Sequence, residues 1–365
     1  MVMEVLDKAH ELEKQGIDIV HMEVGEPDFE MPEIVKKASI EAIEKGLTHY
    51  THSLGDISLR CAISAFYKKE YGVHVDPECI IVTSGSSPAI LMTLMTLCSA
   101  GDEVIVSNPG YPCYKNFAIA CNAVPVDVNV YASDNFQFQI SEVKKAISSR
   151  TRAIFVNSPM NPCGTLVDDI VYKQLISTGI PIISDEIYQG LVYQGKARSI
   201  LEFTDEAFVI NGFSKRFAMT GMRLGYIIAP KKYVRTLQIL QQNLFICAPS
   251  ISQYAAISAL EHGHEAVEKM RIKYNERRLF VIKRLKDMGF EISHDPVGAF
   301  YIFCNASKFT KHSHSFAFDI LEKAHVGICP GIDFGSNGEG YVRFSYTNSM
   351  DRLEEGLCRL ENYLK

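Results

Sequence analysis

A series of short apolar runs between residues 79 and 230 constrains the fold of this chain most strongly. Each run is continuously apolar rather than alternating, which predicts a strand buried on both faces of its sheet. Helical patterns such as residues 140–149 and 169–179 lie between the runs, which favours parallel strands joined by crossovers. We therefore predict an α/β fold with a mostly parallel sheet of the seven-stranded type, sandwiched by helices. The runs are "CIIVTSGSS", "DEVIVSNPGYP", "RAIFVNSPMNPCG", "IPIISDEIY", "AFVINGFSK" and "LGYIIAP".

The pattern changes from about residue 250 onwards. A long helical stretch is followed by short apolar segments that resemble strands and by a final amphipathic helix. We predict a large domain over residues 31–255 and a smaller α+β domain built from residues 1–30 and 256–365. The segments of the smaller domain include "GAFYIFCN", "VGICPG", "GYVRFSY" and "SMDRLEEGLCRLENYL".

The composition argues against several classes of function. The 365 residues include 37 Lys and Arg and 43 Asp and Glu, so we expect no nucleic-acid or anionic-membrane surface. No apolar run approaches the ~20 residues of a membrane helix, and residues 1–16 resemble a charged amphipathic helix rather than a signal peptide. Ten scattered cysteines without a C-x-x-C pair predict reduced thiols in a cytoplasmic protein. The H-x-H pairs at 262–264 and 312–314 lack partners at ligand spacing, so no metal site is predicted.

Polar residues gather where the predicted strands end, and ligands of open α/β sheets bind at that edge. After the first run, Gly85, Ser86 and Ser87 precede a helix with Pro88 at its predicted first position. Free backbone N–H groups, two hydroxyls and the helix dipole would suit a phosphate. Taken alone, these residues fit simple capping of the helix by Ser87 better than a phosphate site. Neither a P-loop nor a G-x-G-x-x-G pattern is present, so a nucleotide is not predicted.

The next strand ends supply an amide and a carboxylate. Asn161 stands before a proline in "NSPMNPCG", a pattern that also builds ordinary turns. Asp185 follows the run "IPIIS" directly, and a carboxylate there is costly unless it meets a cation or caps a helix. Tyr188 lies three residues further on, whereas the neighbouring Glu186 is expected to be solvated.

Three cations complete the set. Lys215 ends the run "AFVINGFS", and a lysine in a dry pocket with cationic neighbours becomes a nucleophilic amine. Arg223 lies between Gly221 and Gly225, which would let its loop approach closely, and its planar fork suits a phosphate or carboxylate. Arg343 lies in a predicted strand of the smaller domain, where a solvent-facing position is the plain alternative.

Each of these signals is modest, but together they match one ligand. A phosphate cradle, an acid, an amide, a tyrosine, a nucleophilic lysine and an arginine complement the phosphate, ring nitrogen, phenolic oxygen and aldehyde of pyridoxal 5′-phosphate. We therefore predict this cofactor from the residues themselves.

The motifs also occur in an order that resembles the class I and II aminotransferases. These are fold-type I pyridoxal-phosphate enzymes of the aspartate aminotransferase superfamily. The resemblance implies an enzyme that moves the amino group of an L-amino acid to a 2-oxo acid in a ping-pong reaction, with a homodimer as the working unit. The matching motifs are "VGEPDF", "HYTHSLGDISLR", "VTSGSSPA", "NPGYPCY", "NSPMNPCG", "SDEIY", "SKRFAMTGMRLGY", "PGIDFG" and "YVRFSY".

The resemblance implies roles for the residues around the reacting atoms. Lys215 would hold the cofactor as an internal aldimine and then carry the proton between Cα and the cofactor. Asp185 would pair with the pyridine nitrogen. Asn161 and Tyr188 would hydrogen-bond the phenolic oxygen, and Asn161 would also contact the substrate. Arg343 would bind the substrate α-carboxylate.

Further roles follow from the same resemblance. Ser86, Ser87 and Arg223 would hold the phosphate, and Tyr111 would stack on the cofactor ring. Tyr50 would reach the phosphate bound in the partner subunit, which implies active sites shared across the dimer.

The chain departs from the family pattern at Gly212, where many relatives carry a phosphate-binding hydroxyl, so Ser214 would contribute there. The backbone of Gly25 would close the site opposite the substrate arginine. The segment before the first helix is shorter than usual, which implies a reduced N-terminal arm or a trimmed start. Neither the preferred amino acid nor a second cation for a distal carboxylate is predicted.

Other functions remain open at this stage. A pyridoxal-phosphate-dependent C–S β-lyase of the cystathionine β-lyase type would use the same core residues. A cofactor-binding transcription regulator would need a DNA-binding domain and a more basic surface. A nucleotide oxidoreductase would need the glycine fingerprint that is missing here.

Overall fold

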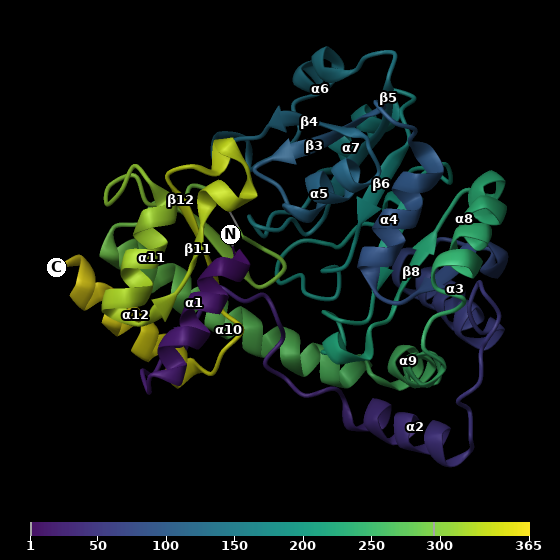
Figure 1. The fold of residues 1–365 in the computed structure, drawn as a ribbon, viewed down its shortest axis with the longest axis horizontal. Helices are drawn as coiled ribbons and strands as arrows, with labels where there is room; N and C mark the ends of the chain where they lie inside the picture. The colour runs from purple at the N-terminus through teal and green to yellow at the C-terminus, as the bar shows by residue number, and fades with distance from the viewer. Residues whose placement is uncertain (1, 295) are drawn as a thin grey trace.

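A seven-stranded sheet dominates the computed structural model, which describes residues 2–294 and 296–365 (Figure 1). Its strand order is β2-β8-β7-β6-β5-β3-β4. Only β8 runs antiparallel to its neighbours, and the other pairs are parallel. The α/β prediction with a mostly parallel sheet is therefore confirmed. The strands are β2 (Ile80–Thr83), β3 (Glu103–Asn108), β4 (Val124–Asn129), β5 (Thr151–Asn157), β6 (Ile182–Asp185), β7 (Phe208–Gly212) and β8 (Gly225–Ile228).

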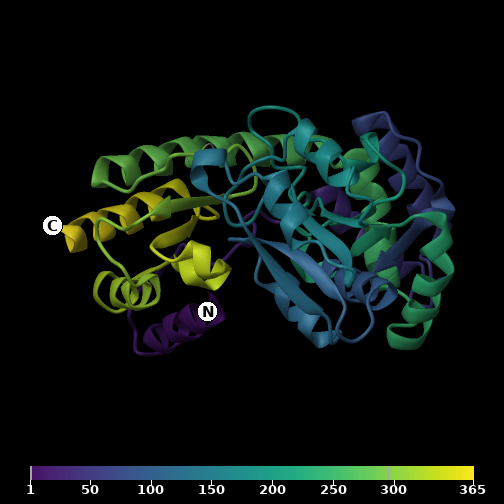
Figure 2. The same cartoon turned by 90° about the horizontal axis from the view of Figure 1, so that it is seen from above.

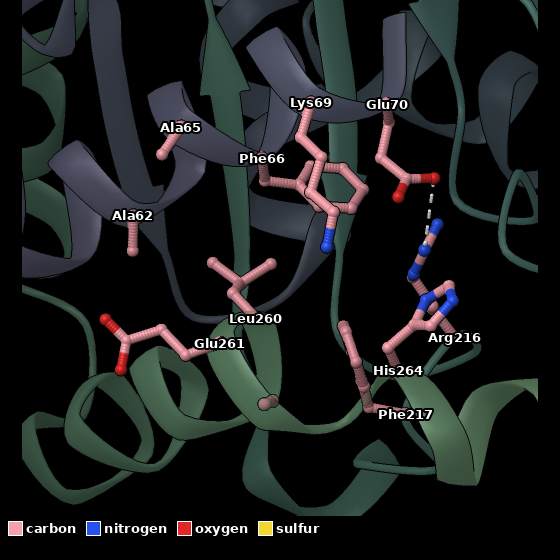
Figure 3. Close-up of a pocket in the computed structure, with 11 residues that line it drawn as sticks. Ala62, Ala65, Phe66, Lys69, Glu70, Arg216, Phe217, Leu260, Glu261 and His264 are labelled. Carbon is pink, nitrogen blue, oxygen red and sulfur yellow. Dashed lines mark hydrogen bonds and ion pairs between the residues drawn. The ribbon is translucent and has the colours of Figure 1, made fainter.

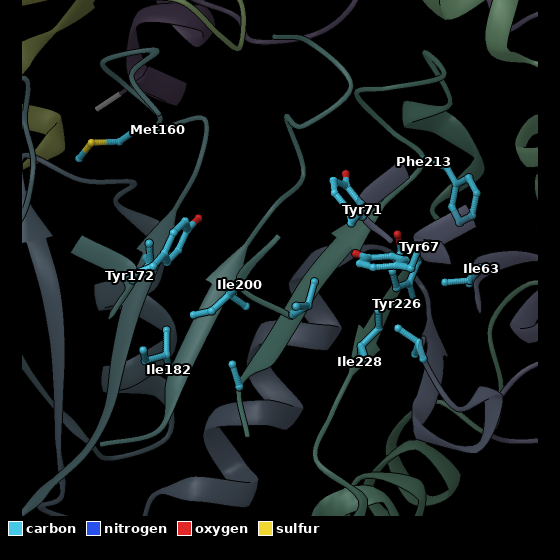
Figure 4. Packing of buried hydrophobic residues seen from close by; sticks show 14 of the residues in the cluster. Ile63, Tyr67, Tyr71, Met160, Tyr172, Ile182, Ile200, Phe213, Tyr226 and Ile228 are labelled. Carbon is cyan, nitrogen blue, oxygen red and sulfur yellow. The ribbon is translucent and has the colours of Figure 1, made fainter. Parts of the chain in front are cut away.

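Both faces of this sheet are buried, as the continuous apolar runs predict. Successive residues of one strand enter different hydrophobic clusters: Ile105 lies in one, whereas Val104 and Val106 lie in the other. Figure 4 shows part of the first cluster, where the rings of Tyr67 and Tyr226 pack on one side of the sheet. The surrounding helices are α2 (Glu33–Glu44), α3 (Ile57–Tyr71), α4 (Ser86–Leu97), α5 (Cys113–Ala120), α6 (Ile140–Ala146), α7 (Asp169–Ile176), α8 (Lys231–Leu244) and α9 (Ser250–His262).

The remaining elements form a smaller layer beside the main sheet (Figures 1 and 2). Three strands pair antiparallel in the order β11-β12-β9, and the short strands β1 and β10 form a separate parallel pair. The elements are β1 (Val20–His21), β9 (Tyr301–Asn305), β10 (Val326–Gly327), β11 (Cys329–Pro330), β12 (Tyr341–Ser345), α1 (Val2–Lys14), α10 (His264–Met288), α11 (Ser313–Ala324) and α12 (Met350–Leu364). Short 3₁₀ helices are η1 (Pro77–Cys79), η2 (Ala132–Asp134), η3 (Ile200–Glu202), η4 (Thr220–Met222), η5 (Gly331–Phe334) and η6 (Ser336–Gly338).

The long helix α10 runs from the main sheet to the smaller layer (Figure 2). The predicted boundary between residues 255 and 256 falls inside α9, and the division into two domains stays a prediction. All ten cysteines have free thiols. Within the described residues no helix has the length and apolar character needed to cross a bilayer, and no cluster of His, Cys, Asp and Glu is placed to hold a metal ion.

The strand register brings the predicted polar residues to one edge of the main sheet. Asn157, the last residue of β5, lies beside Asp185, the last residue of β6. Gly225, the first residue of the antiparallel β8, lies beside both Thr83 and Gly212, which end β2 and β7. Segments that are far apart in the sequence therefore meet at the carboxyl edge of the sheet, where ligands bind in folds of this type.

Candidate active site

A cavity of about 320 Å³ opens where this edge meets the smaller layer. Of the predicted site residues, Gly25, Tyr111, Asn161, Tyr188, Lys215 and Arg343 line it. Its other walls are formed by Met3, Pro112, Cys113, Asn116, Tyr301, Asp333 and Phe334. The predicted residues Tyr50, Ser86, Ser87, Asp185, Ser214 and Arg223 are not in its lining, and their places are described below.

Lys215 lies in the turn that follows β7, and its amine points into the cavity. Its Nζ donates a hydrogen bond to the carbonyl oxygen of Gly25 at 2.7 Å. The pKa of Lys215 is lowered to about 8, chiefly by burial and in part by the charges of Arg223 and Arg343, against the opposing effects of Glu26 and Asp185. A substantial fraction of the amine is therefore neutral near pH 8, the form that attacks a carbonyl carbon.

Glycines explain how the turn carrying Lys215 packs so tightly. A Cβ at Gly212 would lie 2.9 Å from the carbonyl oxygen of Leu224, and one at Gly225 would lie 2.7 Å from the carbonyl carbon of Gly85. The backbone around Gly212 therefore leaves no room for a hydroxyl side chain at this position. The prediction for Gly221 is wrong, because a Cβ there would meet nothing within 4 Å.

Asp185 is buried behind the cavity and is held by a residue that the sequence analysis missed. The hydroxyl of Tyr114 donates to Asp185 Oδ2 at 2.7 Å, and the backbone N–H of Ile187 donates to Oδ1 at 3.2 Å. Burial raises the pKa of Asp185 to about 6 despite these hydrogen bonds. Tyr114 stacks on Phe155, with ring centroids 4.4 Å apart. The carboxylate of Asp185 is therefore held in place, and no cationic side chain of the described residues forms an ion pair with it. This leaves it available to a protonated ring nitrogen.

The prediction that Glu186 is solvated is wrong, because its side chain is fully buried. Glu186 Oε1 accepts hydrogen bonds from the hydroxyls of Ser184 and Ser199, each at 3.1 Å, and from the N–H of Ile200 at 2.9 Å. Burial raises the pKa of Glu186 to about 8, so the carboxyl group is largely protonated at neutral pH. Glu186 therefore ties the end of β6 to η3 and carries little charge.

The start of α4 supplies unpaired backbone donors next to Arg223. No side chain caps this helix, so the capping role considered for Ser87 is not found. The helix begins at Ser86, and Pro88 is its third residue rather than its first. A Cβ at Gly85 would lie 2.6 Å from Nη2 of Arg223, so the guanidinium lies directly over the helix start. Free N–H groups, a helix dipole and an arginine together suit an anion.

The backbone of Arg223 also has an unusual conformation. Its φ is +48°, in the left-handed region, and its Nη1 donates to the carbonyl oxygen of Thr220 at 2.9 Å. Its side chain is exposed, whereas Ser214, in the turn before Lys215, is half-buried. The two cations of this segment therefore point to different parts of the edge, Lys215 to the cavity and Arg223 to the start of α4.

Arg343 is 4% exposed, so the solvent-facing alternative is wrong. Its Nη1 donates to Asn161 Oδ1 at 3.0 Å, and its Nη2 donates to the carbonyl oxygen of Glu23 at 2.6 Å and to Cys329 Sγ at 3.0 Å. Its Nε has no partner among the described residues. A buried guanidinium with no carboxylate partner has spare capacity for an anionic ligand.

Glu23 supports Arg343 through its backbone and was also missed by the sequence analysis. Its buried carboxylate lies 2.6 Å from His21 Nδ1, and Glu13 of α1 lies 3.0 Å from His21 Nε2. The hydrogen bond with Glu23 raises the pKa of His21 to about 9. A charged histidine therefore links α1, β1 and the carbonyl group that holds Arg343.

Gly25 lies against a pair of tyrosines at the opposite wall. The hydroxyls of Tyr188 and Tyr301 are 3.0 Å apart, and a Cβ at Gly25 would overlap the hydroxyl of Tyr301.

Gly25→Ala is therefore expected to displace Tyr301 and raise KM for amino acids by about 10-fold or more, as small misplacements in active sites do. Steady-state kinetics check this result.

Gly221→Ala is the matched control for Gly25→Ala, because nothing lies within 4 Å of its added Cβ. Its KM should stay within about twofold of the wild-type value, as for surface substitutions without contacts. Equal effects of the two substitutions would contradict the steric role of Gly25.

Tyr50 lies away from the cavity, with 80% of its surface exposed. It lines a separate surface depression together with His49, Thr51 and Tyr254. Among the described residues, none forms a hydrogen bond with the hydroxyl of Tyr50. The role predicted for Tyr50, contact with the phosphate in the partner subunit, stays a prediction.

A second cavity, of about 220 Å³, lies between α3 and the end of α9, with His264 of α10 and Arg216 beside them, and contains none of the predicted site residues (Figure 3). Its chief feature is Arg216, whose guanidinium stacks 4.7 Å from the ring centroid of Phe66 and pairs with Glu70 at 3.4 Å. Arg216 follows Lys215 directly, so these contacts anchor the turn that carries the reactive amine.

The arrangement fits pyridoxal phosphate. The cavity offers the half-buried amine of Lys215 for an aldehyde, and Tyr188 and Asn161 for a phenolic oxygen. The fixed carboxylate of Asp185, outside the lining, suits a ring nitrogen. The start of α4 and Arg223 offer donors for the phosphate. The separate positions of these groups match the separate functional groups of the cofactor.

Comparisons with known proteins agree with this chemistry. The family model for class I and II aminotransferases matches residues 17–360. The (5-formylfuran-3-yl)methyl phosphate transaminase of Methanocaldococcus jannaschii is 42% identical, over 100% of this chain and 96% of that protein. Aromatic-amino-acid aminotransferase 2 of Thermococcus litoralis is 38% identical over 96% of this chain and 93% of that protein. The solved structure of Thermus thermophilus aspartate aminotransferase with maleate is 34% identical, covers 99% of this chain and 96% of that one, and has a TM-score of 0.94.

These matches span nearly the whole chain and are all to enzymes that transfer amino groups, and none of them favours a C–S lyase. The chain therefore belongs to the class I and II aminotransferases and is a pyridoxal phosphate-dependent transaminase.

Proposed function

We propose that the cavity around Lys215 is the active site and that its residues divide the reaction between them. The observation that carries this proposal is the placement of a half-buried amine with a lowered pKa and a buried guanidinium without a carboxylate partner in one cavity. Pyridoxal phosphate, when bound, supplies an aldehyde that condenses with amines and a protonated ring that accepts the electron pair left at Cα. The protein must then hold the ring, orient the amino acid and move one proton.

The cofactor is held at three places in this proposal. Ser86, Ser87, Ser214 and Arg223 bind the phosphate, because the uncapped start of α4 and the overlying guanidinium supply its donors. The fixed carboxylate of Asp185 keeps the ring nitrogen protonated.

The faces and the phenolic oxygen of the ring are held by other side chains. Tyr188 and Asn161 donate to the phenolic oxygen, and Tyr111 covers one face of the ring. Both tyrosines and Asn161 line the cavity beside Lys215, which supports these roles.

Arg343 orients the amino acid by binding its α-carboxylate in a two-pronged manner. Asn161 and the carbonyl of Glu23 hold the guanidinium from behind, so little side-chain entropy is lost when the substrate binds. The backbone of Gly25 closes the opposite side, next to Tyr301.

Lys215 moves the proton once its amine is free. Its lowered pKa of about 8 makes it a base of suitable strength near neutral pH. With the cofactor bound, the amine of Lys215 would take the proton from Cα of the amino acid and pass it on. The net half-reaction would consume one water, release a 2-oxo acid and leave the amino group on the cofactor, from which a second 2-oxo acid would take it up in reverse.

We further propose that the chain works as a homodimer, with Tyr50 reaching the phosphate site of the partner subunit. Tyr50 is exposed, and so are Ile40, Ile43 and Ile57 on the neighbouring helices α2 and α3. Exposed apolar side chains on the helices that flank an exposed tyrosine in the sequence are typical of a protein interface.

The half-reaction tests the proposed function directly. Holoenzyme mixed with an L-amino acid and no oxo acid should convert once to the pyridoxamine form, with absorbance growing near ~330 nm and one equivalent of 2-oxo acid released. Continued release of pyruvate and thiol from a cysteine-type substrate would instead show a β-lyase.

A further inference from the structure

Tyr301 is a buried residue of the cavity wall for which the proposed function gives no role. It is the first residue of β9 and is 2% exposed. Its hydroxyl lies 3.0 Å from the hydroxyl of Tyr188, and the centroid of its ring lies 4.2 Å from the guanidinium carbon of Arg343. Tyr301 therefore contacts one residue proposed to hold the cofactor and one proposed to hold the substrate.

The hydroxyls of Tyr188 and Tyr301 share one hydrogen bond, and its direction follows from the role proposed for Tyr188. Burial raises the pKa of both hydroxyls above the ordinary value for tyrosine, so both keep their protons at neutral pH. Each phenol has a single proton to donate. Because Tyr188 gives its proton to the phenolic oxygen of the cofactor in the proposed function, it accepts the hydrogen bond from Tyr301. The hydrogen bonds then run in one direction, from Tyr301 to Tyr188 to the cofactor.

We infer, building on the proposed function, that Tyr301 is a further positioning residue whose hydroxyl and ring act separately. Its hydroxyl donates to Tyr188 and thereby strengthens the hydrogen bond that Tyr188 donates to the phenolic oxygen. Its ring packs on the guanidinium of Arg343 and holds it in place for the substrate α-carboxylate. One side chain then links the place of the cofactor to the place of the substrate.

The effect of the hydroxyl rests on how hydrogen bonds in a chain polarise one another. A phenol that accepts a hydrogen bond becomes a stronger donor, by about 10–30%. The link between Lys215 and the cofactor carries a proton next to the phenolic oxygen, and that oxygen is most negative when this proton is absent. Donors to the oxygen therefore favour loss of the proton and lower the pH at which the absorbance of the holoenzyme changes. Tyr301 lowers this pH through Tyr188.

The effect of the ring rests on the burial of the cation beside it. Arg343 is 4% exposed, and a cation within about 6 Å of an aromatic centroid is attracted to the ring, more strongly where water is excluded. Unlike a hydrogen bond, this attraction need not occupy an N–H donor of the guanidinium, so the donors can serve a carboxylate. The ring thus restrains Arg343 without competing with the substrate.

A pH titration of the holoenzyme absorbance without substrate tests the hydroxyl. Tyr188→Phe removes the direct donor and should raise the midpoint by about one pH unit or more, as for one hydrogen bond to a charged group. Tyr301→Phe keeps the ring and should raise the midpoint by about 0.3 pH unit. The double variant should match Tyr188→Phe alone, since Tyr301 acts through Tyr188. Tyr301→Phe leaves unchanged the other titratable groups that face the pair, among them Tyr111, Cys329 and Arg343.

Tyr346→Phe is the matched control for the titration. Tyr346 is fully buried, its hydroxyl donates to the carbonyl oxygen of Ala299 at 3.2 Å, and it does not line the cavity. Its midpoint should equal that of the wild type. Equal midpoints for Tyr301→Phe and Tyr346→Phe, or additive shifts in the double variant, would overturn the inference while the proposed function stands. An unchanged midpoint in Tyr188→Phe would instead remove the role proposed for Tyr188, and the inference with it.

Steady-state kinetics with an L-amino acid test the ring. Tyr301→Leu removes both the ring and the hydroxyl and should raise KM by about 10-fold or more, the range of a desolvated contact between a cation and a ring. Tyr301→Phe, which keeps the ring, should stay within about twofold of the wild-type KM. Equal KM values in Tyr301→Leu and Tyr301→Phe would overturn the role inferred for the ring.

Discussion

Lys215→Ala is expected to lower kcat/KM for transamination by about 10,000-fold or more, because in the proposed function this one residue carries both the covalent attachment and the proton transfer. The variant should still bind pyridoxal phosphate, since the groups at the start of α4 and Asp185 remain. Its bound cofactor should lack the absorbance of a covalent link to the protein. Activity assays and absorbance spectra of the same preparation check both expectations.

Lys69→Ala provides a matched control, because Lys69 lines the second cavity and is exposed there. Its activity and spectrum should match those of the wild type. Loss of activity in Lys69→Ala, or a covalent link that survives in Lys215→Ala, would contradict the role given to Lys215.

Asp185→Asn should have the second-largest effect. Asparagine keeps the size and can still accept the hydrogen bond from Tyr114, but it has no charge to hold a protonated ring nitrogen. We expect kcat to fall by about 1,000-fold, as when one partner of a buried ion pair is removed.

Tyr114→Phe, which removes the hydroxyl and leaves the carboxylate, should lower kcat by about 10-fold, the cost of one hydrogen bond to a charged group.

The pH dependence of cofactor binding follows from the same residue. Burial raises the pKa of Asp185 to about 6 in the free protein, so the carboxylate is present above that pH and lost below it. Binding of pyridoxal phosphate to the apo protein should therefore weaken as the pH falls through about 6, and Asp185→Asn should lose this dependence. A full wild-type pH profile in Asp185→Asn would contradict the assignment.

Much of the site could be predicted because its residues follow recognisable strands. Asp185, Asn161 and Lys215 each stand just beyond an apolar run, and parallel strands bring their carboxyl ends to one edge. The inference needs only the order of the runs and not the contacts between them. The same logic failed for Glu186, where the residue after a strand end turned into the protein rather than toward water.

The supporting contacts could not be predicted, because they join residues that are far apart in the sequence. Glu23 holds Arg343 across 320 positions, and Tyr114 holds Asp185 across 71. No local pattern in the sequence marks such pairs, since their geometry depends on how the smaller layer packs on the main sheet.

The glycines show the same limit. Gly221 and Gly225 look alike in the sequence, but only Gly225 packs against the backbone of Gly85 and Ser86. Their difference depends on which segment lies opposite, and that is known only once β2 and β8 are paired.

The central claim is that Lys215 forms the covalent bond to the cofactor. Reduction of the wild-type holoenzyme with borohydride, followed by proteolysis and mass spectrometry, identifies the lysine that carries the pyridoxyl group. The account predicts one modified peptide, containing the sequence "NGFSK" and modified at Lys215. Modification of another lysine, or no modified peptide from a holoenzyme that is active, would contradict it.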